Sequence, residues 1–135
     1  MDRFKLDSRL ESASAFITDL GLCQARLHKN INFPWILLIP REPDVKELTD
    51  LNEDQQIRLM KEISKASKVM QSLFCPDKMN VATLGNIVSQ LHIHVIARFI
   101  NDPAWPHAVW GYDEKIGLKA ELDKMIAQIK PLLLG

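Results

Sequence analysis

The stretch 89–98, SQLHIHVIAR, alternates polar and apolar side chains over its central residues and predicts a strand. Because strand side chains point to opposite faces in turn, Gln90, His92 and His94 share one face and an apolar set occupies the other. Neighbouring positions on one face lie about 6.6 Å apart along the strand. A row of one amide and two imidazoles on an apolar support can hold an anion, a metal ion or a reacting phosphate.

A chain of 135 residues is long enough to build one core, so we expect a single domain over residues 1–135. Its content of 47% hydrophobic and 25% charged residues is ordinary for a soluble globular protein. Lys plus Arg and Asp plus Glu number 17 each, so no long-range field favours nucleic acid or an anionic membrane. Any anion site must therefore arise from local geometry.

The two cysteines, Cys23 and Cys75, lie in dissimilar contexts without a CxxC pattern, so we expect free thiols in a reducing compartment. The first residues, MDRFKLD, lack an apolar run of signal-peptide length, and no apolar run approaches a membrane span. The sequence therefore predicts a cytoplasmic protein that binds neither a membrane nor nucleic acid.

Hydrophobic spacing predicts an α+β order of elements. The long helix is the clearest, because Asn52 and Gln55 form a capping-box pattern ahead of an apolar stripe. Short turns join neighbouring strands, which favours an antiparallel sheet with helices packed on it. The expected elements are a helix over 7–20, strands over 22–27 and 35–39, a long helix over 53–73, strands over 79–84 and 89–98, an irregular segment over 101–112, and a helix over 114–130 that ends near Pro131.

Three interpretations of the histidine pair compete. The structural one places two polar residues on the solvent face of an edge strand. The metal one uses His92 and His94 as two ligands, but it needs a third. No Glu or third His lies nearby on the strand, and the remaining histidines are His28 and His107. The last interpretation is nucleophilic catalysis at phosphorus, which needs no further ligand.

Chemistry at phosphorus suits a neutral imidazole, since a useful fraction of the rings is unprotonated near neutral pH. The ring attacks the phosphate, expels a leaving group and forms a phosphoramidate that water later cleaves. Such a nucleophile needs a carbonyl partner for its other ring nitrogen and neighbouring donors for the phosphate oxygens. Gln90 and His94, two positions either side of His92, are the candidate donors.

The segment Gln90–Ile96, QLHIHVI, resembles the signature of the histidine-triad (HIT) nucleotide hydrolases and transferases, H-φ-H-φ-H-φ-φ with φ apolar. Gln90 stands where that motif has its first histidine. The resemblance continues through FPWILLIPR with LTDL, and through KMNVA to Gly85 and Asn86. The tail DPAWP with Trp110 and Gly111 resembles a bacterial subgroup that also carries the Gln. The resemblance covers residues 10–112.

This resemblance implies an α+β fold with a central antiparallel sheet of about five strands, one long helix, and N- and C-terminal helices, usually in a homodimer. It also implies a purine nucleotide pocket and substrates such as nucleoside phosphoramidates or dinucleoside polyphosphates. His92 would attack the α-phosphate to give a nucleotidyl-histidine, His94 would help hold the phosphate, and Gln90 would take the first histidine's place. No metal or other cofactor is required by that mechanism.

Substrate contacts are expected from several polar residues. The resemblance implies that Asn86 contacts phosphate, that Asn80 lies near a second phosphate contact, and that Asn30 lies where the family binds ribose. Arg98 shares the face of His92 if the strand is regular, so it is a candidate phosphate ligand, with an ion pair as the alternative.

The three tryptophans divide into two groups. Trp35, inside an apolar run, is expected to be core or pocket wall. Trp105 and Trp110 follow the histidine strand in an irregular segment, where an aromatic ring can stack on a base, cover a partner's site, or simply pack. Trp105 is therefore a candidate base contact.

Two alternative functions stay open. An amide at position 90 cannot titrate, so the chain could be a nucleotide-binding module with little turnover. A small metal-binding hydrolase that uses the pair His92 and His94 is the second alternative. Metal content and sensitivity of turnover to chelators would separate it from the histidine nucleophile.

Overall fold

Five strands form a single antiparallel sheet in the computed structural model, which describes residues 3–135. The strand order is β1-β2-β3-β5-β4, with every neighbouring pair antiparallel. The α+β class expected from the sequence, and the antiparallel sheet of about five strands implied by the family resemblance, are therefore confirmed. The elements are α1 (Ser8–Ala13), β1 (Ser14–Asp19), β2 (Cys23–His28), β3 (Trp35–Pro40), the 3-10 turn η1 (Leu48–Asp50), α2 (Glu53–Phe74), β4 (Lys78–Thr83), β5 (Ile93–Arg98) and α3 (Lys119–Leu134).

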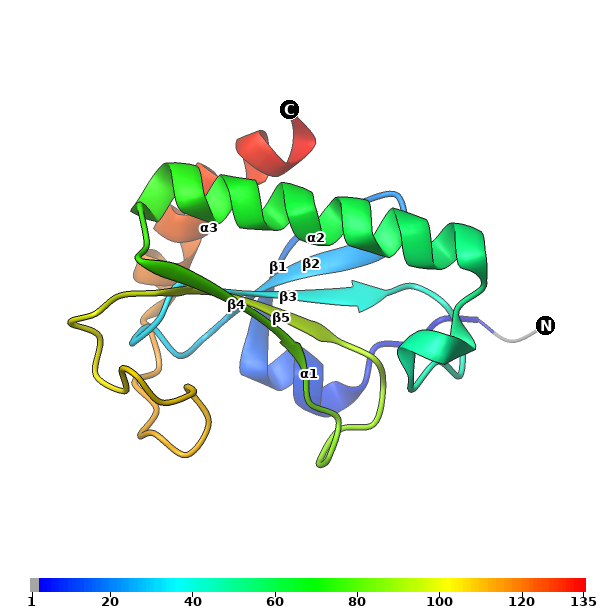
Figure 1. The fold of residues 1–135 in the computed structure, drawn as a ribbon, viewed down its shortest axis with the longest axis horizontal. Coiled ribbons are helices and arrows are strands. Elements are labelled where there is room, and N and C mark those ends of the chain that lie inside the picture. Colours follow the sequence, from blue (N-terminus) through cyan, green and yellow to red (C-terminus); the bar gives the residue numbers. More distant parts are fainter. Residues whose placement is uncertain (1–2) are drawn as a thin grey trace.

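Each face of the sheet carries its own hydrophobic core. α2 lies across one face with α3 behind it, and α1 lies on the opposite side of the sheet (Figure 1). The core under α2 and α3 includes Ile36 of β3 and Met70 of α2. The second core joins Leu10 of α1 to Trp35 of β3 and to Val109, which lies in the segment between β5 and α3.

The alternation of side chains along β5 distributes them between these two cores. Ile93 and Val95 belong to the core under α2, whereas Ile96 belongs to the opposite one. His94 and Arg98 therefore lie on the face away from α2. β5 is shorter than expected, because it begins at Ile93 and leaves His92 as the last residue of the preceding loop.

α2 forms where the capping-box pattern predicts it. The Asn52 side chain accepts from the Gln55 amide at 2.9 Å, and the Gln55 side chain accepts from the Asn52 amide at 2.9 Å. These bonds satisfy two N–H groups that no helical carbonyl can reach. The apolar stripe buries Leu59, Ala66 and Met70 against the sheet. No helix within residues 3–135 is long and apolar enough to cross a bilayer.

The expected helix over 7–20 is wrong in its second half. α1 is a single short helix, and β1 continues from Ser14 as an edge strand paired with β2. The Arg26 guanidinium on β2 donates to the Ser14 hydroxyl at 2.7 Å and to its carbonyl at 2.9 Å, which fixes the switch from helix to strand. A register shift after Phe16 breaks the strand alternation and buries Ile17, so the apolar spacing imitates a helix.

The C-terminal helix is displaced from its expected range of 114–130. The first part of that range runs against the turn after β2, where the Gly117 amide donates to the Lys29 carbonyl at 2.8 Å. α3 begins after this contact and continues through Pro131. Pro131 lies in the last turn, where it removes a single backbone hydrogen bond, and the buried Leu133 holds that turn on the core.

Candidate active site

His92 directly precedes β5 and is 6% exposed. Its Nδ1 lies 2.7 Å from the backbone carbonyl oxygen of Gln90. A carbonyl oxygen only accepts, so Nδ1 carries the proton and donates it, and Nε2 of the neutral ring keeps its lone pair. A histidine held in this tautomer presents a nucleophilic nitrogen.

His94 on β5 takes the opposite tautomer. The indole N–H of Trp35 on β3 donates to Nδ1 of His94 at 3.0 Å. An indole nitrogen only donates, so this Nδ1 is unprotonated and the neutral ring carries its proton on Nε2. That Nε2 is buried and has no hydrogen-bond partner within residues 3–135. Because an unpaired buried donor is unfavourable, this atom marks a place for an acceptor atom of a ligand.

Burial lowers the pKa of two site histidines, with the nearby charge of His92 as the next cause. The pKa of His28 falls from 6.5 to about 4, and that of His94 falls from 6.5 to about 3. The charged form of either ring would lose its hydration without gaining a counter-ion. Both rings are therefore neutral at physiological pH, and His94 is a neutral N–H donor.

The rings of His92 and His94 lie 4.9 Å apart between centroids, with their planes 70° apart. One ring offers a lone pair on Nε2 and the other offers an N–H on Nε2. This combination of a nucleophile and a neighbouring hydrogen-bond donor suits attack on a phosphate, since the donor stabilises charge on the oxygens as the new bond forms.

Trp35 joins two of these histidines. The His28 ring at the end of β2 stacks on Trp35 with centroids 3.9 Å apart and planes 11° apart. Nδ1 of His28 accepts from the Asn30 amide at 3.0 Å, so its proton also lies on Nε2. Sequence reasoning assigned no role to His28, because only the pairing of β2 with β3 brings it to Trp35.

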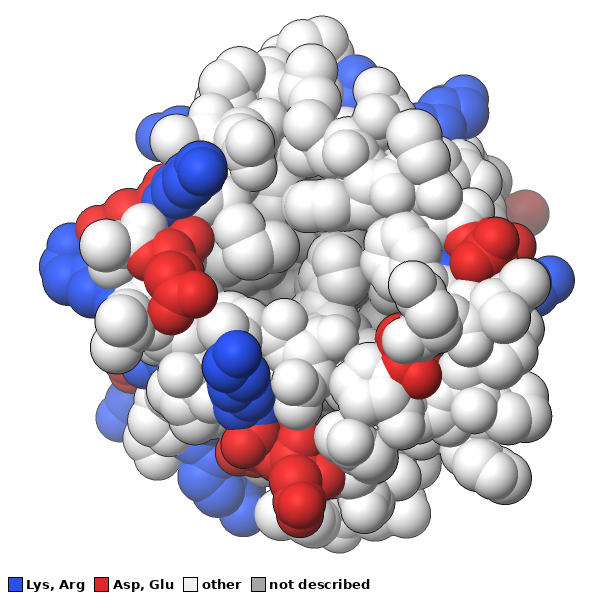
Figure 2. Space-filling model, turned by 90° about the vertical axis from the view of Figure 1, so that its left-hand side faces the viewer, with Lys and Arg blue, Asp and Glu red and all other residues white. Residues whose placement is uncertain are grey.

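Trp110 completes the aromatic surroundings of His94. It belongs to the segment between β5 and α3, and its ring centroid lies 4.9 Å from that of His94. Figure 2 looks onto the end of the molecule where the first part of this segment lies, and shows a hollow bordered by uncharged side chains, with charged side chains toward the rim. An uncharged, aromatic neighbourhood can take a nucleobase, whose π-face stacks on such rings.

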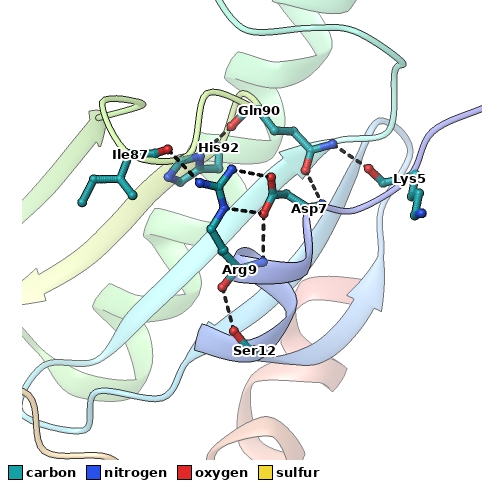
Figure 3. A network of polar contacts seen from close by, with 7 residues as sticks. All are labelled: Lys5, Asp7, Arg9, Ser12, Ile87, Gln90 and His92. Atoms are coloured by element: carbon teal, nitrogen blue, oxygen red, sulfur yellow. Dashed lines mark hydrogen bonds and ion pairs between the residues drawn. The ribbon is translucent and has the colours of Figure 1, made fainter.

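Gln90 is placed differently from the expected phosphate donor. Its Oε1 accepts from the Asp7 amide at 2.8 Å, and its Nε2 donates to the Lys5 carbonyl at 2.8 Å (Figure 3). Both polar atoms of the side-chain amide are therefore engaged by the backbone of the N-terminal segment. The carbonyl of Gln90, rather than its side chain, contacts the nucleophile candidate His92.

Asn86 lies in the loop before β5, and the structure leaves it available for a ligand. A cavity of about 260 Å³ is lined by this loop together with His92 and Lys46. Asn86 is exposed, and its side chain makes no hydrogen bond within residues 3–135. The expected phosphate contact at Asn86 therefore stays a prediction.

Arg98, Asn80 and Trp105, three predicted substrate contacts, instead share one structural cluster. The Arg98 guanidinium donates to the Asp102 carboxylate at 2.7 and 3.1 Å and to Oδ1 of Asn80 at 2.8 Å. Trp105 packs against the same guanidinium, 5.8 Å from its ring centroid. The side chains of Arg98 and Asp102 are only 2% and 4% exposed. Arg98 thus lies in a buried ion pair, and Trp110 is the tryptophan whose ring lies beside His94; the expected substrate contacts of Arg98, Asn80 and Trp105 stay predictions.

Asn30 holds the turn after β2 in place, and its expected ribose contact stays a prediction. It is 2% exposed, and its Oδ1 accepts from the Asn32 amide at 3.1 Å and from the Lys115 amide at 3.2 Å. These bonds hold the turn after β2 against the segment that precedes α3. These contacts within the chain follow only from the fold, because Lys115 lies 85 residues from Asn30 in the sequence.

The metal interpretation needs a third ligand. Within residues 3–135, no group of three or more His, Cys, Asp or Glu side chains is placed to hold a metal ion. In addition, Nδ1 of His92 and Nδ1 of His94 are already hydrogen-bonded. The two histidines therefore offer only their Nε2 atoms, one of which carries a proton in the neutral ring.

Comparison with known proteins places this chain in a family. The family model of the HIT domain matches residues 9–101. A histidine triad protein from Bradyrhizobium japonicum is 41% identical, with 98% of this chain and 99% of that chain covered and a TM-score of 0.94. A histidine triad protein from Marinobacter aquaeolei VT8 is 40% identical, with 98% of each chain covered and a TM-score of 0.95.

The fold also resembles, more distantly, that of an enzyme named for its substrate. Plasmodium falciparum diadenosine triphosphate hydrolase is 20% identical, with 99% of this chain and 86% of that chain covered and a TM-score of 0.63. At that identity the likeness concerns the fold alone. None of the curated proteins compared with the chain matches it. The HIT-domain match over residues 9–101 and the two relatives near 40% identity show that the chain belongs to the histidine triad (HIT) family.

Proposed function

We propose that this HIT-family protein is a nucleotide hydrolase or nucleotidyl transferase that forms a covalent nucleotidyl-histidine on His92. The substrates are purine nucleoside phosphoramidates or dinucleoside polyphosphates, attacked at the α-phosphate. The observation that carries the proposal is the 2.7 Å contact between Nδ1 of His92 and the Gln90 carbonyl, because it leaves the Nε2 lone pair available for attack.

In the first step, the Nε2 lone pair of His92 forms a bond to the α-phosphorus, and the bond from phosphorus to the leaving group breaks. The leaving group departs with the electron pair of that bond and takes up a proton from solvent. In the second step, a water molecule attacks the same phosphorus and releases a proton to solvent, the electron pair of the bond to phosphorus returns to Nε2, and a nucleoside monophosphate leaves. An alcohol or phosphate acceptor in place of water gives transfer instead of hydrolysis.

His94 contributes as a hydrogen-bond donor in this scheme. Its buried Nε2–H lacks a partner within residues 3–135, and a non-bridging phosphate oxygen would supply one. Burial lowers the pKa of His94 to about 3, so at neutral pH the ring is uncharged and its single proton on Nε2 is available as a hydrogen-bond donor. Asn86, in the loop beside His92, is the second proposed phosphate contact.

The name of the Plasmodium relative supports the choice of dinucleoside polyphosphates, since that protein is a diadenosine triphosphate hydrolase with the same fold. The aromatic rings of Trp110 and Trp35 beside His94 support a purine as the base. No metal or other cofactor takes part in the proposed steps. Turnover that needs stoichiometric zinc and disappears in chelator would favour the metal-binding hydrolase instead.

The test is a single-turnover reaction with adenosine 5′-phosphoramidate or diadenosine tetraphosphate, quenched in alkali and read by intact mass spectrometry. We expect a mass gain of one adenylyl group that is absent from His92→Ala. His107→Ala is the matched control, because His107 is exposed in the segment after β5 and its loss should leave the adduct unchanged. Nucleotide binding without adduct or turnover would instead identify a nucleotide-binding module.

We also propose a homodimer, as the family resemblance implies. Edge strand β4 supports it, since Val81 on this strand is 46% exposed and its outer backbone edge is unpaired within residues 3–135. Sedimentation velocity over a range of protein concentrations measures the mass directly. A monomer at all concentrations would contradict the dimer without affecting the proposed chemistry.

A further inference from the structure

The N-terminal segment is fastened to the loop that carries the nucleophile. Gln90, two residues before His92, binds the backbone of this segment at two points, the Lys5 carbonyl and the Asp7 amide, both at 2.8 Å (Figure 3). These contacts join positions 85 and 83 residues apart. A side-chain amide carries one acceptor and donors on adjacent atoms, so a single Gln can hold two peptide groups at once.

The fastened segment brings Arg9 to the loop before β5. Nε and Nη2 of Arg9 donate to the two oxygens of Asp7 at 3.1 and 2.9 Å, and Nη1 donates to the Ile87 carbonyl at 3.2 Å. A guanidinium has five N–H groups, and these contacts use three of them. The side chain is 59% exposed, so its remaining N–H groups are open to a ligand.

Arg9 lies close to the proposed reaction centre. Ile87, its carbonyl partner, directly follows Asn86 in the loop whose cavity also contains His92. Asp7, its carboxylate partner, has its pKa lowered to about 2, chiefly by hydrogen bonds from Arg9, and the charge of His92 is among the smaller causes. The hydrogen bonds of Arg9 thus join Asp7 to the loop that leads to His92.

The charge of the substrate gives Arg9 a role. Both Arg98 and Arg9 are paired with a carboxylate, but the side chain of Arg98 is 2% exposed and that of Arg9 is 59% exposed, so only Arg9 has N–H groups open to a substrate. A dinucleoside polyphosphate brings a leaving group with several phosphate charges, whereas a phosphoramidate loses an uncharged amine. A guanidinium matches phosphate oxygens in both charge and planar geometry, and Asp7 keeps that plane fixed.

We infer that Arg9 is a specificity-determining residue that binds the phosphates of the leaving group, and that Gln90 is a positioning residue that docks the segment carrying it. This inference rests on the proposed function and narrows its substrate class to nucleotides with a phosphorylated leaving group. It also gives the Gln at the first motif position a physical role, since its side-chain amide holds the N-terminal segment in place.

The experiment compares kcat/KM for two substrates that carry the same adenylyl group and differ in the leaving group, diadenosine tetraphosphate and adenosine 5′-phosphoramidate. Arg9→Gln should lower kcat/KM for the tetraphosphate about 10- to 100-fold, the range expected for loss of a hydrogen bond to a charged group. The kcat/KM for the phosphoramidate should stay within about twofold of the wild-type value. Arg3→Gln is the matched control, because it removes the same charge from the same exposed segment. Equal effects on both substrates, or no effect, would overturn the role of Arg9.

Gln90→Met tests the positioning role with a side chain of similar length that cannot hydrogen-bond the backbone. We expect the same selective loss for the tetraphosphate, no further loss in the double variant with Arg9→Gln, and faster tryptic cleavage after Arg9. A loss of equal size for both substrates would show that Gln90 acts on the chemical step, and would contradict the inference.

Failure of the proposed function gives a separate result. If the wild-type chain turns over neither substrate, the inference is decided by binding of diadenosine tetraphosphate and AMP, measured by calorimetry. Arg9→Gln should then weaken the binding of diadenosine tetraphosphate and leave the binding of AMP unchanged. Equal affinities of the wild-type and variant proteins for the tetraphosphate would overturn the inference on its own.

Discussion

Trp35 decides which nitrogen of His94 carries the proton. The two residues are 59 positions apart, and the 3.0 Å hydrogen bond between them is buried. Without the indole N–H, the buried Nδ1 of His94 would lose its partner, and the ring could place its proton there instead of on Nε2. The proposed phosphate donor therefore depends on a residue that does not touch the phosphate itself.

We predict that Trp35→Phe lowers kcat about 5- to 10-fold, the effect of losing one hydrogen bond of about 1 kcal/mol, with a smaller change in KM. Nitrogen-15 NMR of the imidazoles should show His94 shifting from the Nε2–H toward the Nδ1–H tautomer. Trp110→Phe is the matched comparison for the NMR result, since Trp110 touches the same ring without a hydrogen bond to it within residues 3–135. An unchanged tautomer in Trp35→Phe would contradict the prediction.

At the scale of the elements, one buried ion pair fastens the segment between β5 and α3 to the sheet. Arg98 at the end of β5 binds Asp102 at 2.7 Å and the His107 carbonyl at 2.8 Å. Burial opposes the ionisation of Asp102, but hydrogen bonds from Arg98 and from backbone amides outweigh it and lower its pKa to about 2. The segment between β5 and α3, held in this way, places the Trp110 ring beside that of His94.

We predict that Arg98→Met destabilises the protein by about 3–5 kcal/mol, because it leaves the Asp102 carboxylate buried without its cation. Urea unfolding measures this loss. Arg58→Met, on an exposed face of α2, should change the free energy of unfolding by less than about 0.5 kcal/mol. A variant with normal stability and weak nucleotide binding would instead support the phosphate contact that the sequence suggested for Arg98.

For the molecule as a whole, two neutral histidines, the half-buried His28 and the buried His94, make the free energy of unfolding depend on pH. In the unfolded chain each has its ordinary pKa of 6.5, whereas in the folded chain the pKa is about 4 for His28 and about 3 for His94. Between these values the unfolded state binds more protons than the folded state. Stability therefore falls as the pH drops through this range.

Below pH 6.5, we predict that each histidine lowers the free energy of unfolding by up to about 1.4 kcal/mol per pH unit. This decrease levels off only as the pH reaches the folded-state pKa values of about 4 for His28 and about 3 for His94. Urea unfolding at a series of pH values measures the slope. His28→Gln should reduce the slope by about half in the upper part of the range, whereas His107→Gln, at an exposed position, should leave it unchanged. A flat profile in the wild-type protein would disprove the prediction.

Local patterns were sufficient for several elements. The capping box at Asn52 and Gln55 predicts the start of α2, and the alternation from Leu91 to Val95 predicts which side chains of β5 face α2. The signature around His92 is also local, because its carbonyl partner lies only two residues away. Patterns of this kind depend on neighbours in the sequence, so the sequence alone determines them.

The tertiary structure decided the features that depend on distant partners. Pairing with β2 turns residues 14–19 into a strand despite their helical spacing. Arg98 forms an ion pair because the chain turns after β5 and brings Asp102 back to it. The Gln90 side chain binds the N-terminal segment because the fold brings the Lys5 carbonyl within hydrogen-bond distance. The sequence by itself determined the long helix and most of the sheet-forming segments, and it pointed to His92 as the candidate nucleophile. Which polar groups stay free for a ligand follows only from the hydrogen bonds that the fold has already formed.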